Sequence, residues 1–265
     1  MTAILRAVLI AFFVMTAAWT VSSPPAGAHP EDEFCSLDGG LDPALCRALQ
    51  QIDRAPGTDR GDQRFTGTET IDFDRPALET FWLYIEIGVR HILPTGTDHI
   101  LFVLALFFST RRLRPLLIQI SAFTVAHTAT LGLVAAGVFA PPASVVEPLI
   151  AATIAFVAVE NLIFKDMTRW RPLVVFAFGL IHGMGFAGFF GELGIPANQF
   201  WSALIGFNIG VEIGQLSVVL VAALLMWPIA KTLGEGRYRQ YVVWPACLLI
   251  SAIGAFWAFE RVFLG

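Results

Sequence analysis

Five long apolar segments follow one another between Leu116 and Phe263. A run of about 18 or more apolar residues is typical of a membrane-spanning helix, because a helix satisfies its own backbone hydrogen bonds in lipid. The composition agrees, since 56% of the residues are hydrophobic and 14% are charged, against about 25% charged in soluble domains. We therefore expect an all-α, polytopic membrane helix bundle. The predicted spans are Leu116–Val138, Val145–Phe164, Pro172–Phe190, Phe200–Trp227 and Tyr241–Phe263.

The basic residues between these segments predict how the bundle lies in the membrane. Lysine and arginine occur in alternate loops, at 111–114, 165–171 and 231–239. The intervening loops, FAPPAS and GELGIPANQ, contain neither. Because positive charge marks the cytoplasmic side of a membrane protein, we expect the three basic loops inside and the C-terminus outside.

A further, broken span is expected before the first basic loop, which gives about six spans in all. The segment up to Ala77 and that loop are predicted on opposite sides, so the chain between them crosses once. An unbroken helix from Phe81 to Phe108 would be about 42 Å long, against about 30 Å of hydrocarbon. Pro94 and Gly96 disrupt backbone hydrogen bonding, which places the break there. In transporters, broken helices commonly mark the binding site.

The chain is expected to have three parts. Residues 1–28 have an early base, an apolar core and a small-residue ending, which is typical of a secretory signal peptide, either cleaved or retained as an anchor. Residues 29–77 form an acidic extracytoplasmic segment with too few large apolar residues for a core. Its Cys35 and Cys46 can form a disulfide in an oxidising compartment. Residues 78–265 form the transmembrane helical domain.

Ionisable side chains lie inside the predicted spans, where they are costly. A carboxylate at the centre of a span costs about 2.5–3.5 kcal/mol, and we expect no lysine or arginine at that depth to pair with it. A proton, a mutual hydrogen bond or a bound cation would offset the charge, and imidazole with carboxylate suits nickel, cobalt, zinc or copper. The candidate metal ligands are His91, Asp98, His99, His127, His182 and Glu212. The candidate supporting polar residues are Thr124, Thr128, Glu160, Asn161, Asn208 and Gln215.

These polar residues also have a purely structural interpretation. A single histidine in a span is often a packing residue that forms a hydrogen bond, and Glu160 with Asn161 can simply join helices.

Gly206, Gly210 and Gly214 have the spacing that lets another helix approach closely. They lie on the face opposite the polar side chains of the same span, so that span is predicted to pack on one side and line a polar site on the other.

Five motifs resemble, in order, those of the HupE/UreJ membrane proteins, especially the second subgroup of that family. They are HILPTGTDHILFVLALF, FTVAHTATLGL, VENLIF, FGLIHGMGFA and FNIGVEIGQ, between about Phe81 and Leu225. The resemblance implies a multi-pass protein with a secretory signal that transports nickel, and by extension cobalt, often linked to hydrogenase or urease maturation. It also assigns function to His91, Asp98, His99, His182, Gly183 and Glu212. Six residues separate His91 from Asp98, against four or five in nickel permeases of this family.

Three functions are compatible with these features. The first is a permease of the bacterial inner membrane for a divalent transition-metal ion, above all nickel, with Asp98 and His99 as the selectivity site. The second is a membrane-embedded metal-dependent hydrolase, in which three histidines and a carboxylate hold zinc and leave a position for water. The third is a non-transporting metal-binding or assembly factor. The expected partners are the metal ion and the lipid bilayer, and no nucleic acid.

Overall fold

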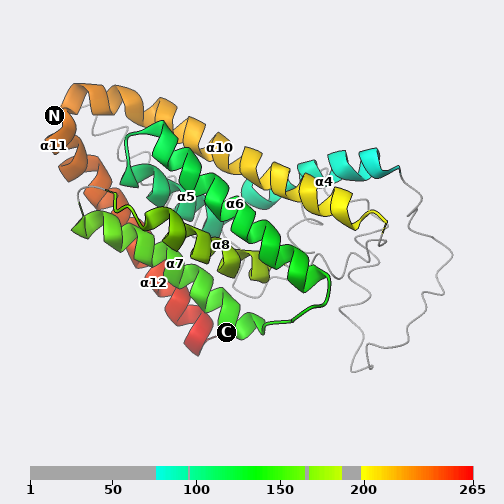
Figure 1. The fold of residues 1–265 in the computed structure, drawn as a ribbon. Helices are drawn as coiled ribbons and strands as arrows, with labels where there is room; N and C mark the ends of the chain where they lie inside the picture. Colours follow the sequence, from blue (N-terminus) through cyan, green and yellow to red (C-terminus); the bar gives the residue numbers. More distant parts are fainter. Residues whose placement is uncertain (1–75, 95, 165–166, 187–197, 265) are drawn as a thin grey trace.

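The computed structural model describes residues 76–94, 96–164, 167–186 and 198–264 (Figure 1). Within these ranges the chain forms helices joined by turns, without a strand. The helices are α4 (Ala77–Ile92), α5 (Thr97–Ser109), α6 (Leu113–Ala135), α7 (Ala143–Ile163), α8 (Arg171–Gly185), α10 (Phe200–Leu233), α11 (Glu235–Tyr238), the π-helical turn η1 (Arg239–Val243) and α12 (Trp244–Phe263). The all-α bundle is confirmed. The predicted signal peptide, most of the acidic segment and both cysteines of the predicted disulfide lie outside the described residues.

The number of membrane-spanning helices is close to the prediction. Four stretches are long and apolar enough to cross a bilayer: α6, α7, α10 and the continuous run from Glu235 to Phe263. Helices α4 and α5 pass the same test together and are bent by 73° at the expected position. Helix α8 has 15 residues, fewer than the about 20 needed to span. The predicted span continues to Phe190, and its last residues lie outside the described part of the chain. Length and composition therefore give four or five spans, against about six expected.

Helices α4 and α10 pack closely and run in the same direction. A Cβ at Gly206 would collide with the carbonyl group of Phe81, and one at Gly210 with that of Ile85. One turn further along α10, the third glycine of the series packs against Ile92. Because the residue numbers rise together along both helices, the two run parallel. The close approach predicted from the glycine spacing is confirmed.

Glycine also brings α8 against α6. A Cβ at Gly179 would collide with the carbonyl group of Phe123, and one at Gly183 with that of His127. The rising residue numbers again show that the two helices are parallel. Since His182 adjoins Gly183, this contact holds its imidazole at the level of His127.

The third close pair, α7 and α12, is antiparallel. Asn161 near the end of α7 contacts Cys247 near the start of α12, and Arg261 at the other end of α12 contacts Glu147. Two parallel pairs and one antiparallel pair are what alternating crossings require, if α4 with α5 counts as one crossing and α8 as another. The relative directions of the helices thus agree with the alternation of the basic loops.

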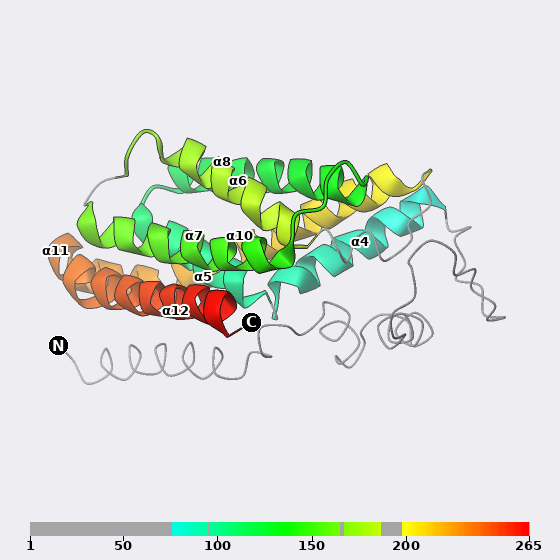
Figure 2. The same ribbon diagram turned by 90° about the horizontal axis from the view of Figure 1, so that it is seen from below.

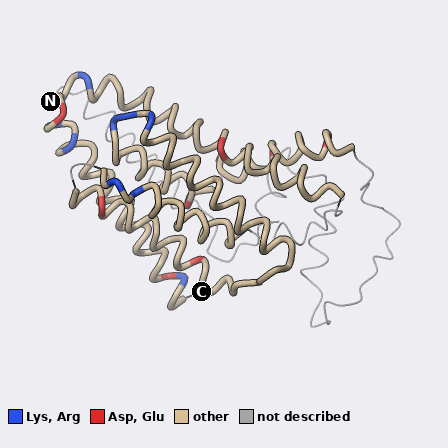
Figure 3. The backbone as a smooth tube through the Cα atoms, in the orientation of Figure 1, with Lys and Arg blue, Asp and Glu red and all other residues tan. Residues whose placement is uncertain are grey.

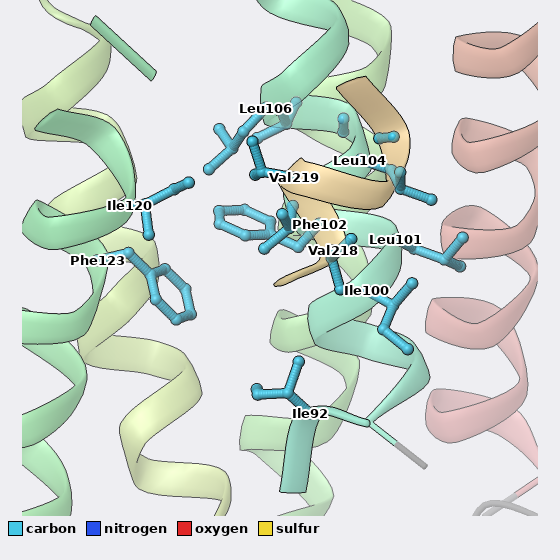
Figure 4. Close-up of a cluster of buried hydrophobic side chains, with 14 of the residues drawn as sticks. Ile92, Ile100, Leu101, Phe102, Leu104, Leu106, Ile120, Phe123, Val218 and Val219 are labelled. Atoms are coloured by element: carbon cyan, nitrogen blue, oxygen red, sulfur yellow. The ribbon is translucent and has the colours of Figure 1, made fainter. Parts of the chain in front are cut away.

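Helix α5 lies at the centre of the bundle (Figure 2). All residues from His99 to Leu106 are buried. Figure 4 shows its side chains Ile100, Leu101 and Leu104 on the side away from Ile120 and Phe123 of α6, with Val218 and Val219 of α10 beside them. A helix that is apolar all round belongs in such a surrounding. The break before α5 is only partly covered by the bundle, since Pro94 is exposed and Leu93 and Gly96 are half-buried.

Most lysines and arginines of the described residues lie at one end of the bundle, where α5 and α10 end and α6 and α8 begin (Figure 3). Helix α10 extends further into this end than predicted, because it continues past Trp227 through Pro228 to Leu233. A proline interrupts one backbone hydrogen bond, which a membrane helix tolerates when its neighbours or its side chains compensate. The bond that Pro228 cannot make is the one to the carbonyl of Leu224. The carbonyl of Pro228 itself accepts a hydrogen bond from the Thr232 hydroxyl.

A candidate metal site

Four buried histidines from four helices meet next to the helix break. His91 lies in the last turn of α4 and His99 in the first turn of α5, so the break turns the two imidazoles toward each other. Their ring centroids are 4.8 Å apart. His127 of α6 and His182 of α8 approach His99 with centroid distances of 5.9 and 5.1 Å. We call these four residues the histidine cluster.

Three members of the histidine cluster can bind one metal ion together. Ligand nitrogens of His91, His99 and His127 all lie within 4.8 Å of one another. In a tetrahedral complex with metal–nitrogen bonds of 2.0–2.1 Å, the nitrogens are separated by about 3.3 Å. Side-chain adjustments on the order of an ångström would therefore bring the three nitrogens to bonding distance.

The hydrogen bonds of His127 direct one nitrogen toward the cluster. Nδ1 lies 3.0 Å from Oδ1 of Asn208, whose amide group donates to the carbonyl of Leu204 at 2.8 Å. Oδ1 is therefore the acceptor, and Nδ1 of His127 carries the proton that it receives. Nε2 then has a lone pair and has no hydrogen-bond partner in the described residues. A histidine ligand of a metal is commonly oriented in this way.

Thr153 orients His182 by the same principle. Its hydroxyl donates to the carbonyl of Ile150 at 2.7 Å and lies 2.9 Å from Nε2 of His182. With its proton engaged, the hydroxyl oxygen accepts the hydrogen of Nε2. Nδ1 of His182 therefore has the lone pair, and it too lacks a partner in the described residues.

The inward nitrogens of the cluster are unusual for a protein interior. Both nitrogens of His91 and Nε2 of His99 are also buried without a partner in the part of the chain described. Buried polar atoms are normally hydrogen-bonded, and each orphan costs about 1–3 kcal/mol. Phenylalanine rings surround the cluster. The ring centroid of Phe186 lies 4.1 Å from that of His91, and the centroid of Phe123 lies 5.0 Å from that of His182. A ligand that accepts several lone pairs at once would satisfy one nitrogen of each of these imidazole rings, because a neutral imidazole has one lone pair and one N–H.

Comparison with protein families supplies an independent observation. The family model described as "HupE / UreJ protein" matches residues 68–261, which is more than half of the chain. The chain belongs to the HupE/UreJ family. It is thus a multi-pass membrane protein of a group related to nickel and cobalt transport. Comparison with curated proteins and comparison with solved structures gave no match.

Two carboxylates that the sequence placed at or near the HupE/UreJ site are paired with arginines instead. Asp98 forms an ion pair with Arg261 at 3.0 Å, and Glu160 forms one with Arg171 at 3.4 Å. The expectation that no arginine reaches them was wrong. Arg171 and Arg261 lie near helix ends, and the packing of α8 and α12 brings their long side chains to the carboxylates.

Glu212 also lies outside the histidine cluster. Its Oε1 accepts a hydrogen bond from Ser121 at 2.8 Å, on an exposed part of the contact between α10 and α6. Asn208 and Glu212 lie one turn apart on the same face of α10, so both contact α6, and Asn208 is the one that bonds to a histidine of the cluster. Neither Glu212 nor Asp98 belongs to the group of three metal-ligand residues in the described part of the chain, which is His91, His99 and His127.

Of the remaining supporting residues, Asn208 alone contacts the cluster through a recorded hydrogen bond. Thr124 bonds to Gln215 at 3.2 Å between α6 and α10, and Thr128 bonds back to the carbonyl of Thr124. Asn161 donates to the carbonyl of Ala105 in α5 and accepts from an arginine. Thr124, Gln215 and Asn161 thus join helices, whereas the bond of Thr128 stays within α6.

The sequence reasoning missed Thr153 and Arg261. A threonine within an apolar span is too common to be noticed without its partner. Arg261 lies inside the last predicted span, three residues from the end of the described chain, and was not considered as a partner for any carboxylate.

Proposed function

We propose that this HupE/UreJ protein is a membrane permease for a divalent transition-metal ion, with Ni²⁺ as the first candidate and Co²⁺ as the second. The observation that carries the proposal is the histidine cluster, whose unpartnered ring nitrogens converge beside a helix break. The ion is the substrate, and the imidazoles of His91, His99, His127 and His182 bind it during passage.

The ligand type sets the class of ion. Imidazole nitrogen suits nickel, copper, zinc and cobalt, whereas magnesium and calcium prefer carboxylate, carbonyl and water oxygen. The described residues add no carboxylate to the group of ligands. Binding therefore depends on the lone pairs of the rings, which favours transition metals over alkaline-earth ions.

The position of the cluster supports transport over hydrolysis. His91 and His99 belong to two helices on either side of the break, so a change in the angle between α4 and α5 separates two ligands of the same ion. A permease must release its ion, whereas a hydrolase holds a fixed metal and needs a base beside its water. Membership in a family related to metal transport points the same way.

The expected location is the bacterial inner membrane, with the N-terminal segment and the C-terminus outside the cytoplasm. The gathering of basic residues at one end of the bundle supports this orientation (Figure 3). If the ion is nickel, the protein supplies nickel for the maturation of hydrogenase or urease, as the family resemblance implies. The activity of those enzymes in a strain lacking the protein, grown at low nickel, tests that link.

The experiment is uptake of Ni²⁺, Co²⁺, Zn²⁺ and Cu²⁺ into proteoliposomes containing the purified full-length protein. The test variants are His99→Ala and His127→Ala. The control is Thr232→Ala, which removes a hydroxyl bonded within its own helix near the other end of α10. Saturable uptake of one ion, lost in both histidine variants and kept in the control, is the expected result. Stoichiometric metal retained through purification without uptake would refute a permease and favour a hydrolase or a metal-binding factor.

A further inference from the structure

One ion pair stands immediately beside the histidine cluster. Arg261 donates to both carboxylate oxygens of Asp98, at 3.0 and 3.3 Å. The same guanidinium donates to the carbonyl of Glu147 at 3.1 Å and lies 5.6 Å from the ring centroid of Trp257. The pair is largely buried, with side-chain exposures of 15% for Arg261 and 21% for Asp98. It therefore links the start of α5 to both α7 and α12.

Asp98 and its neighbour His99 serve different sides of α5. Successive residues in an α-helix point about 100° apart. His99 faces Phe123 and His127 of α6 and His182 of α8, whereas Asp98 faces the α7–α12 pair. Both oxygens of the carboxylate are engaged by the guanidinium, and the carboxylate is not part of the group of metal-ligand atoms.

We propose that Arg261 is a positioning residue of the metal site, and that Asp98 acts by binding Arg261 and not by binding the ion. This inference rests on the proposed function. Helix α5 begins directly after the break, so no continuous helix before it fixes the rotation of its first turn. A bidentate carboxylate–guanidinium pair has a fixed geometry, and it sets the rotation of that turn. The rotation in turn places the His99 ring against His91 and His127.

The test is a double-mutant cycle with Asp98→Asn, Arg261→Gln and the double variant. Affinity for Co²⁺ and its absorption spectrum are measured on the detergent-solubilised full chain. Loss of a group that orients a ligand weakens metal binding by about 10–100-fold. We expect both single variants to lose the same factor within that range, and the double variant to lose no more than either, because the pair acts as a unit. The Co²⁺ spectrum of the double variant keeps the wild-type shape.

Two further variants guard against misfolding and unspecific charge effects. The exchanged pair, Asp98→Arg with Arg261→Asp, restores an ion pair but cannot offer a carboxylate from α5, so it should recover affinity over the single variants. Glu86→Gln is the matched control, since it breaks an ion pair that is more exposed than the Asp98–Arg261 pair. The side-chain exposures are 30% for Arg90 and 59% for Glu86. It should bind Co²⁺ like the wild type.

Each opposite result overturns the inference. Asp98 is a ligand if Arg261→Gln binds Co²⁺ normally while every variant without Asp98 binds it weakly and with a changed spectrum. Those variants are Asp98→Asn, the double variant and the exchanged pair. If Arg261→Gln binds normally in any other combination, or the double variant loses the product of the two single factors, then the pair does not position the site. A wild-type protein that binds no metal refutes the proposed function itself, which keeps the two failures distinct.

Discussion

Replacing Asn208 by alanine tests whether the cluster binds metal through oriented imidazoles. The substitution removes the acceptor that lies 3.0 Å from Nδ1 of His127 and leaves the ring itself in place. The buried N–H then has no partner, and the ring loses the constraint that keeps Nε2 toward His91 and His99. Loss of such an outer contact weakens metal affinity by about 10–100-fold, which corresponds to about 1.4–2.8 kcal/mol.

The assay is competition for Ni²⁺ between the solubilised protein and a chelator of known affinity. Asn208→Asp retains an acceptor and adds a negative charge that raises ligand basicity, so its affinity should equal or exceed the wild-type value. Ser217→Ala is the control, because this serine lies on the same helix and bonds to the carbonyl of Ile213. Wild-type affinity in Asn208→Ala together with loss of binding in His127→Ala would refute the orienting role.

Three further predictions concern the site and the packing that supports it. Thr153→Val should weaken Ni²⁺ binding about 10-fold in the same competition, because it removes the acceptor for an imidazole, and Thr153→Ser should retain it; equal weakening in both would contradict this. Gly210→Val should lower stability by about 1–3 kcal/mol or more through overpacking against the carbonyl of Ile85, and an unchanged thermal midpoint in detergent would show that α4 and α10 can separate freely. Arg171→Met should lower the free energy of unfolding by about 3–5 kcal/mol, because it leaves the charge of Glu160 without its arginine. Adding Glu160→Gln should restore part of the lost thermal midpoint. No recovery would mean that the lost packing of Arg171 dominates.

The helices and the break could be predicted because they follow from local physical rules. Apolar length predicts a span, and Pro94 with Gly96 interrupts a segment that was too long for one crossing. The glycine series at Gly206 and Gly210 predicted a close neighbour but could not identify it as α4. Spacing shows that a helix can be approached, whereas the identity of the partner depends on how the whole bundle packs.

The ion pairs could not be predicted for a different reason. Asp98 and Arg261 lie 163 residues apart, and each stands near a helix end, where the sequence does not fix the depth of a long side chain. Arginine can extend along a helix by several ångströms and still present its charge at another level. The cost of burying Asp98 and Glu160 was therefore assigned to a metal, although arginines offset it in the structure.

This reassignment changes the electrostatics of the site. With Asp98 and Glu160 each bound to an arginine, the described part of the site offers an entering divalent ion four neutral imidazoles and surrounding phenylalanine rings. A charge without a counter-charge is costly in an apolar environment, so the coordinate bonds must offset that cost and the net affinity is lower than a carboxylate would give. Lower affinity suits a permease, because an ion that is held too tightly cannot leave. In the permease that we propose, the arginine pairs thus keep negative charge away from the ion, which lets the imidazoles select a transition metal without trapping it.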